Sequence, residues 1–285
     1  VNGASMNNQG VEFTVSFKSD PSSEFQWAVS ANIGTYKTEL TDLPSNVINK
    51  YAGDGVHDLI LGRSPNSAYG LVADGIFKTQ EEVDAHADQP GKAVGRIRYK
   101  DLDGDGVINE TYDRTWIGCY DPDFFGGLNF DFAYKGFDLN LFFEGMFGND
   151  VNSDWKKESD IWLFTNPAWK NHATRMLGGW SPDNPNSDIP AISNNTANQE
   201  QRFSSWFIED GSYIKLRNIE LGYTFPTKLI KKMHMSNLRL YAAAYNVFTL
   251  KKFWGDDKYT SFDPERPSYH YLTPFTFNFG INVSF

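Results

Sequence analysis

Residues 275–285 read FTFNFGINVSF, and every odd-numbered residue is apolar while every even-numbered one is small, and polar except at Gly280. Successive side chains of a β-strand point to opposite faces, so this alternation predicts a strand with one apolar and one polar face. At about 3.3 Å per residue and a tilt of about 45°, eleven residues rise about 25 Å, which is the height of the apolar band around an outer-membrane barrel. The stretch is therefore long enough to cross a membrane.

Similar stretches recur along the chain, and several are paired across short turns. We expect seven strands, near residues 10–18, 24–35, 125–135, 136–147, 213–225, 237–248 and 274–285. In LRLYAAAYNVF, residues 238–248, the alternation is blurred, and the sequence leaves its two faces unassigned. Long excursions over residues 37–123, 148–212 and 249–273 alternate with the short turns. Long loops on one side and short turns on the other are typical of bacterial outer-membrane barrels, whose long loops are extracellular.

The composition is consistent with strands whose apolar residues occupy alternate positions. Aromatic residues make up 16% of the 285 residues, yet the mean hydropathy is -0.49. No run approaches the about 18 consecutive apolar residues of a membrane helix. A soluble β-sandwich also alternates apolar and polar residues, but strand length, aromatic apolar positions and the loop asymmetry favour the membrane. The sequence therefore predicts an all-β protein, a transmembrane antiparallel β-barrel with long extracellular loops.

Charge and cysteine content exclude other classes. The net charge of -10 argues against a nucleic-acid partner, because phosphate binding requires clustered Lys and Arg. The single cysteine excludes an internal disulfide. Acidic residues on the polar phase of the strands would face a wet lumen, where they either keep it hydrated or contact cargo; they are Glu12, Asp131, Asp138, Glu144 and Glu220.

One local motif indicates a metal site. The stretch DLDGDGVINETYD, residues 101–113, opens with the D-x-D-x-D-G pattern of a calcium loop, in which hard oxygen ligands alternate around a sharp glycine turn. The candidate ligands are Asp101, Asp103, Asp105, the carbonyl of Val107, Asn109 and Asp113. The twelfth position, where a bidentate acid should close the loop, is Tyr112. The alternative is a solvated acidic turn, and a bound Ca²⁺ would staple a long loop rather than catalyse a reaction.

Two further features of the excursions have structural interpretations. Thr79 and Glu82 have the spacing of a capping box, which predicts a short helix. The excursion 148–212 contains five tryptophans that either form a small core or grip cargo; they are Trp155, Trp162, Trp169, Trp180 and Trp206. The sequence contains neither G-x-S-x-G nor H-E-x-x-H, and the five histidines lack ligand spacing. We therefore expect no enzyme activity, no organic cofactor and no catalytic residues, and the substrate-binding residues stay unassigned.

A series of strings, in order and at matching spacing, resembles one family across nearly the whole chain. The strings are AYGLVADGIFKTQEEVD (68–84), IRYKDLDGDGVIN (97–109), DRTWIG (113–118), NFDFAYKGFDLNLFFEG (129–145), DGSYIKLRNIELGYTFP (210–226), LRLYAAAYNVFTL (238–250) and FDPE (262–265). They resemble landmarks of the C-terminal barrel portion of the SusC/RagA family of TonB-dependent outer-membrane transporters of Bacteroidetes. Asp103 stands where Asn is usual in that family.

The resemblance implies a plugged barrel of about 22 strands that imports oligosaccharides or peptides. Its implied partners are TonB, which supplies the energy, a SusD-like surface lipoprotein acting as a lid, the rest of the same barrel, and outer-membrane lipid. These residues contain no plug and no TonB box, so we expect the chain to be the last third of the wall of such a barrel. Two alternatives stay open: a SusC-like structural subunit of an outer-membrane assembly without transport, and a soluble calcium-dependent β-rich binding module.

Overall fold

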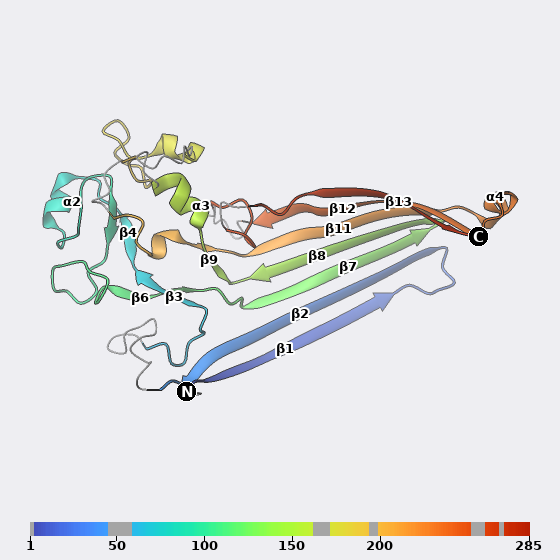
Figure 1. The fold of residues 1–285 in the computed structure, drawn as a ribbon, viewed down its shortest axis with the longest axis horizontal. Coiled ribbons are helices and arrows are strands. Elements are labelled where there is room, and N and C mark those ends of the chain that lie inside the picture. Colours follow the sequence, from blue (N-terminus) through green and yellow to red (C-terminus); the bar gives the residue numbers. More distant parts are fainter. Residues whose placement is uncertain (1–2, 45–58, 162–171, 194–198, 252–259, 268–270) are drawn as a thin grey trace.

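The computed structural model describes residues 3–44, 59–161, 172–193, 199–251, 260–267 and 271–285. Its main feature is an antiparallel sheet of seven long strands (Figure 1). In spatial order the strands are β1 (Ser5–Lys18), β2 (Phe25–Asp42), β7 (Phe124–Tyr134), β8 (Phe137–Phe147), β11 (Tyr213–Thr224), β12 (Asn237–Lys251) and β13 (Thr276–Ser284). The all-β antiparallel class is confirmed. Within the described residues β1 and β13 each pair on one side only, so the sheet is an open piece of wall and not a closed barrel.

One face of the sheet is apolar across all seven strands, because the register aligns the apolar positions. Opposed pairs on this face are Phe13 and Ile33, Val29 and Phe130, Leu141 and Ile219, and Ala244 and Phe277. The side chains are open to the surroundings, with Phe13 62% and Phe279 77% exposed. An apolar surface of this extent is unfavourable in water, and it suits the hydrocarbon of a bilayer.

The first pair of strands is longer than the alternation indicates. The polar residues of SMNNQG at the start of β1 pair with the end of β2, so that Ser5 lies opposite Asp42. Backbone hydrogen bonds hold this part of the ladder, and Asn8 Nδ2 adds a 2.8 Å hydrogen bond to Thr38 Oγ1. The first long connection therefore begins after Asp42 and not at residue 37. Similarly, β12 continues to Lys251.

The faces of β12, which the sequence left unassigned, follow from its register with β13. Ala242 and Ala244 lie opposite Phe279 and Phe277 on the apolar face, whereas Ala243 lies opposite Asn278 on the polar face. Phe248 also takes the apolar face, where its ring contacts the Phe143 ring at 6.4 Å between centroids. The alternation appears blurred in the sequence because alanine occupies both faces of this strand.

Short and long connections leave from opposite ends of the sheet (Figure 1). At one end lie the turn at Lys135 and Gly136, both with positive φ, and the helical linker of α4 (Thr227–Ile230) and η5 (Lys231–Met233). At the other end the chain between β2 and β7, and the chain between β8 and β11, build a separate layer of loops. The functional candidates all lie in this layer or where it meets the sheet.

The loop layer has its own secondary structure and core. Three two-stranded sheets pair β3 (Ser67–Leu71) with β6 (Arg114–Cys119), β4 (Ala73–Ile76) with β5 (Ile97–Tyr99), and β9 (Asp150–Asn152) with β10 (Ile208–Asp210). These six short strands are absent from the sequence-based expectation. A buried cluster joins segments distant in sequence, and it consists of Leu71, Ile76, Ile97, Tyr99, Ile108, Ile161 and Phe207.

The three tryptophans of the excursion 148–212 that the structure describes pack against other side chains of the loop layer or of residues 260–267. Trp180 and Trp206 pack against the buried cluster of the loop layer. Trp155 contacts the Phe262 ring edge-on, at 4.6 Å between centroids. Trp162 and Trp169 lie outside the described residues.

The helices of the described ranges are short. They are α2 (Gln80–Ala85), α3 (Asp154–Lys156), α4, η1 (Lys157–Ile161), η2 (Thr174–Gly178), η4 (Ser205–Phe207) and η5. The capping box is confirmed at α2: the Glu82 N–H donates to Thr79 Oγ1 at 3.3 Å, and the Lys78 N–H donates to the Glu82 carboxylate at 2.7 Å. In the part of the chain that the structure describes, no helix has the length and apolarity needed to cross a membrane.

Candidate functional site

The acidic loop before β6 brings three of its predicted ligands together. Carboxylate oxygens of Asp101, Asp103 and Asp105 all lie within 4.8 Å of one another. Gly104 and Gly106 have positive φ, so the chain turns tightly enough for their N–H groups to donate to Asp101 at 2.7 and 2.9 Å. The hydrogen bond from Gly106 is the largest of the effects that lower the pKa of Asp101 below its ordinary value. The loop therefore presents a concentrated set of hard oxygen donors.

Asp113 and Asn109 have other roles in the structure. Asp113 is fully buried, and its two carboxylate oxygens accept the N–H groups of Leu102 at 2.8 Å and Asn109 at 2.7 Å. Asn109 Oδ1 accepts the N–H groups of Thr111 and Tyr112. These two side chains close the base of the loop. Asp113 is not part of the group formed by the three exposed carboxylates.

Val107 connects the acidic loop to the segment after α2. Its N–H donates to Asp105 Oδ1 at 2.7 Å, and it forms a parallel bridge with Asp88. The bridge consists of hydrogen bonds from the Asp88 N–H to the Gly106 carbonyl at 2.7 Å and from the Ile108 N–H to the Asp88 carbonyl at 2.9 Å. The loop is thereby held against the body of the loop layer. The carboxylate oxygens of Asp101, Asp103 and Asp105 are ligands of the kind that a hard cation such as Ca²⁺ prefers.

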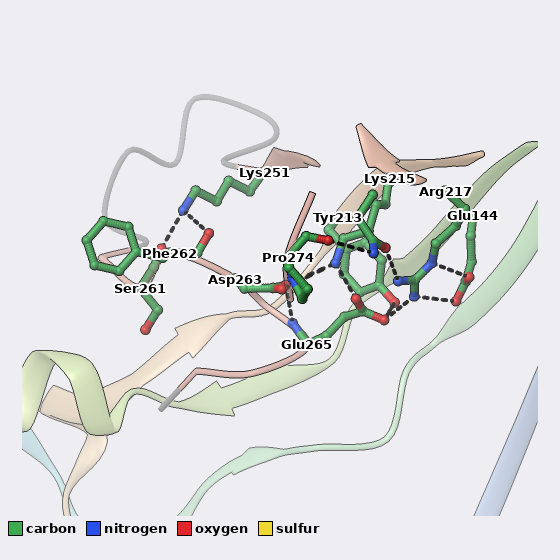
Figure 2. Close-up of polar contacts among 11 residues, drawn as sticks. Glu144, Tyr213, Lys215, Arg217, Lys251, Ser261, Phe262, Asp263, Glu265 and Pro274 are labelled. Carbon is green, nitrogen blue, oxygen red and sulfur yellow. Dashed lines mark hydrogen bonds and ion pairs between the residues drawn. The ribbon is translucent and has the colours of Figure 1, made fainter. Parts of the chain in front are cut away.

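A second constellation lies where the loop layer meets the polar face of the sheet. Residues 260–267, which we call the strap, lie beside Lys215 and Arg217 of β11 (Figure 2). Lys215 of β11 is 1% exposed and donates to Asp263 Oδ1 at 3.1 Å. Lys215 and Arg217 both form ion pairs with Glu265, and Arg217 Nε donates to Glu144 Oε2 of β8 at 2.7 Å. Two cations of β11 thus bind three carboxylates, one from β8 and two from the strap.

A bulge in β11 lies at Arg217. In the pairing of β11 with β8, Leu216 lies opposite Phe143 and Asn218 lies opposite Phe142, so Arg217 is an extra residue. Lys215 and Arg217 are two residues apart, and both reach the strap. The bulge changes the phase of the strand, so that Leu216 and Ile219, three residues apart, both lie on the apolar face.

The strap is attached to the loop layer as well as to the sheet. Lys251 Nζ donates to the carbonyls of Ser261 and Phe262 (Figure 2). The Ser153 and Ser261 hydroxyls share a 2.7 Å hydrogen bond, and Thr260 donates to the Glu209 carboxylate from its N–H and its hydroxyl. The strap therefore ties β8, β11, β12 and the β9–β10 sheet to one another at the rim of the polar face.

Four of the five acidic residues predicted on the polar phase have partners: Asp131, Asp138, Glu144 and Glu220. Arg239 of β12 donates to Asp138 Oδ1 at 3.0 Å and to Glu220 Oε1 at 2.7 Å. Asn140 Nδ2 donates to Asp131 Oδ1 at 2.7 Å. The sequence did not indicate that Lys215, Arg217, Asp263 and Glu265 form one cluster. FDPE is one of the strings of the resemblance, but no local pattern pairs it with β11, since Lys215 and Asp263 are 48 residues apart.

The comparisons with known proteins agree with this architecture. No family model matches the sequence. TonB-dependent receptor P3 of Formosa agariphila is 30% identical over 98% of the chain, and TonB-dependent receptor SusC of Bacteroides thetaiotaomicron is 26% identical over all of it. The chain spans 29% of the length of P3 and 27% of that of SusC. These relatives are named as receptors and not as enzymes.

A solved structure shows the same fold. The RagAB peptide transporter superposes on the whole chain with a TM-score of 0.74 at 21% identity, and the match covers 30% of that transporter chain. The RagAB peptide importer in its "open-open" state gives a TM-score of 0.73. Along its whole length, this chain is similar to a part of the TonB-dependent receptors, SusC among them, and it has the fold of a part of the RagAB transporter chain.

Proposed function

We propose that the protein containing this chain actively imports oligosaccharide or peptide nutrients across the bacterial outer membrane, energised through TonB. The observation that carries the proposal is the match of the whole chain to TonB-dependent receptors, together with a sheet that is apolar on one face and charged on the other. The chain contributes barrel wall and loops, and it binds and guides cargo rather than transforming it. The long connections would then be extracellular and the short turns periplasmic.

The test is uptake by cells that carry or lack the intact protein. Deletion should abolish growth on, and accumulation of, either labelled oligosaccharides or labelled peptides, and dissipating the proton gradient should stop the same uptake. Uptake that survives deletion for every cargo of both classes would contradict import. That result would instead favour a structural subunit of an outer-membrane assembly.

We further propose a SusD-like surface lipoprotein as the lid over the loop layer. The strap supports this, because it fixes the loops at the rim of the polar face and so offers a defined surface at the mouth of the barrel. A surface lipoprotein should co-purify with the tagged intact protein in mild detergent. Recovery of the barrel without any lipoprotein at low ionic strength would oppose this partner.

We also propose that the acidic loop binds Ca²⁺ through Asp101, Asp103 and Asp105, with Val107 and Asn109 supplying further oxygens and Asp113 supporting the loop. Equilibrium dialysis of the intact protein against ⁴⁵Ca²⁺ should show one site that D103N weakens at least about tenfold, since it removes one anionic ligand. D188N, in another exposed part of the loop layer, is the matched control. Equal binding by D103N and the unmodified protein would exclude the site.

A further inference from the structure

The apolar face of the sheet carries a hollow with a defined outline. It has a volume of about 390 Å³ and lies at the loop end of β7 and β8, flanked by β2 and β11. All four strands have both neighbours in the described sheet, so the hollow is complete without any further part of the wall. Its position and boundaries can therefore be assigned from this chain alone.

A pair of glycines forms the floor of the hollow. Gly126 of β7 lies opposite Gly145 of β8, and the same row continues to Ile33 on one side and Ile214 on the other. Two adjacent positions without side chains lower the surface to the backbone, while the two isoleucines form side walls. The result is a trough along the strands.

Aromatic rings close the trough at both ends. Phe124 and Phe147 stack at 4.8 Å between centroids on the loop side, and Phe130 and Phe143 meet edge-to-face at 6.2 Å on the turn side. The lining is almost entirely apolar. The trough therefore offers dispersion contacts and hydrophobic burial but no ion pair to orient a ligand.

We propose that this trough binds an acyl chain of a membrane lipid. The occupant follows from continuity: the trough is a depression in the apolar face that contacts the bilayer, so hydrocarbon chains are the surrounding solvent. A narrow apolar slot on a strand surface gives a methylene chain contacts on three sides, where the flat remainder of the face gives contacts on one. The inference rests on the membrane location in the proposed function, under which this end lies in the outer leaflet.

Photocrosslinking of the intact protein tests the proposal. The probe is a phosphatidylethanolamine with a diazirine in one acyl chain, in vesicles of phosphatidylethanolamine and phosphatidylglycerol. Label should be enriched severalfold, per exposed area, on the peptides that contain Phe124–Leu128 and Gly145–Phe147, relative to Phe277 and Phe279 of the same face.

Two variants fill the trough in different ways. Gly145→Leu places a side chain on its floor, where a Cβ atom would contact the tip of the Phe147 ring at 3.0 Å. Ile33→Trp narrows it from a side wall that is 50% exposed, so this variant keeps the test open if Gly145→Leu fails to fold. Both should reduce the enrichment to the level of the rest of the face. Ile281→Trp on β13, at an apolar position away from the trough, should leave it unchanged, and altered gel mobility on heating checks folding of each variant.

The outcomes separate the two proposals. Label spread over the apolar face in proportion to exposure, or enrichment that both filling variants leave intact, would overturn the acyl-chain site and leave the membrane location standing. Absence of label from the entire apolar face, Phe279 included, would overturn the membrane location itself.

Discussion

Individual glycines in the sheet have different reasons to lack a side chain. By its position in the sequence, Gly280 is one of the small residues on the polar face of the last strand. The structure shows that the Tyr241 ring of β12 lies over it, where a Cβ atom would collide with the tip of that ring. At Gly126, by contrast, a Cβ atom would collide with the backbone carbonyl of Asn32. A ring at the end of a side chain can rotate away, whereas a paired backbone cannot.

This difference predicts unequal costs for the same substitution. Gly126→Ala should lower the unfolding free energy of the intact protein by about 1–3 kcal/mol, the typical cost of overpacking. Gly280→Ala is the matched control and should lower the unfolding free energy clearly less, because the Tyr241 ring can rotate away. Urea unfolding in detergent, followed by tryptophan fluorescence, measures both. A larger loss for Gly280→Ala would show that the Tyr241 ring is the more rigid neighbour.

Lys215 is the residue on which the strap depends most. Its removal leaves Asp263, which is 8% exposed, without its cation, and breaking a buried pair costs about 3–5 kcal/mol. Lys215→Met should fall at the lower end of that range, since Arg217 still holds Glu265. The expected result is a lower thermal midpoint and faster protease cleavage within 260–267.

The control for that variant is Lys37→Met. Lys37 is exposed and pairs with Glu39 on the surface of β2, and such pairs contribute little to stability. It should leave the midpoint and the cleavage rate nearly unchanged. Equal effects of the two variants would mean that the ion cluster does not hold the strap.

Among the elements, the strap links acidity to the order of the loop layer. Burial would raise the pKa of Glu265, but hydrogen bonds from Arg217 and Lys215 outweigh it and hold the pKa below its ordinary value of 4.5. A carboxyl whose folded-state pKa is lowered stabilises the fold fully above its ordinary pKa, and this contribution is lost as the pH falls through the lowered value.

The strap should therefore loosen in acid and not in base. Hydrogen–deuterium exchange of residues 260–267, corrected for the intrinsic pH dependence of exchange, should accelerate as the pH falls below the ordinary pKa of Glu265. Glu265→Gln should exchange faster at neutral pH and show a weaker pH dependence. Protection that is constant across the acid range in the unmodified protein would contradict the linkage.

At the scale of the whole molecule, the sheet ends in two edge strands, β1 and β13. Within the described residues, β1 and β13 have free ladder edges, and unpaired backbone groups in a bilayer cost several kcal/mol each. The 285 residues added alone to phosphatidylcholine vesicles should therefore fail to form a protease-resistant, heat-modifiable barrel. The intact protein is the control, and resistance of the 285 residues alone would indicate that copies of the sheet pair with one another.

The sequence predicted the main sheet well because its signal is local. Alternation marks the two faces where their side chains differ in polarity, as in FTFNFGINVSF, and it fails at β12, where alanine occupies both faces. It also missed the polar start of β1, because backbone pairing with β2 requires no particular side chains. The acidic loop was visible as a motif, but the sequence could not show that Asp113 is buried and bonded to the backbone.

By itself, then, the sequence determined the class of fold, the apolar face and the acidic loop, because a two-residue period and a turn motif depend only on neighbouring residues. The tertiary structure alone decided that Arg217 is an extra residue in its strand, that Asp263 and Glu265 meet Lys215, and that Gly126 meets Gly145 to open a trough. Each of these contacts depends on strand register and loop path. Register sets which residues meet across the sheet, and it arises from the folded chain as a whole.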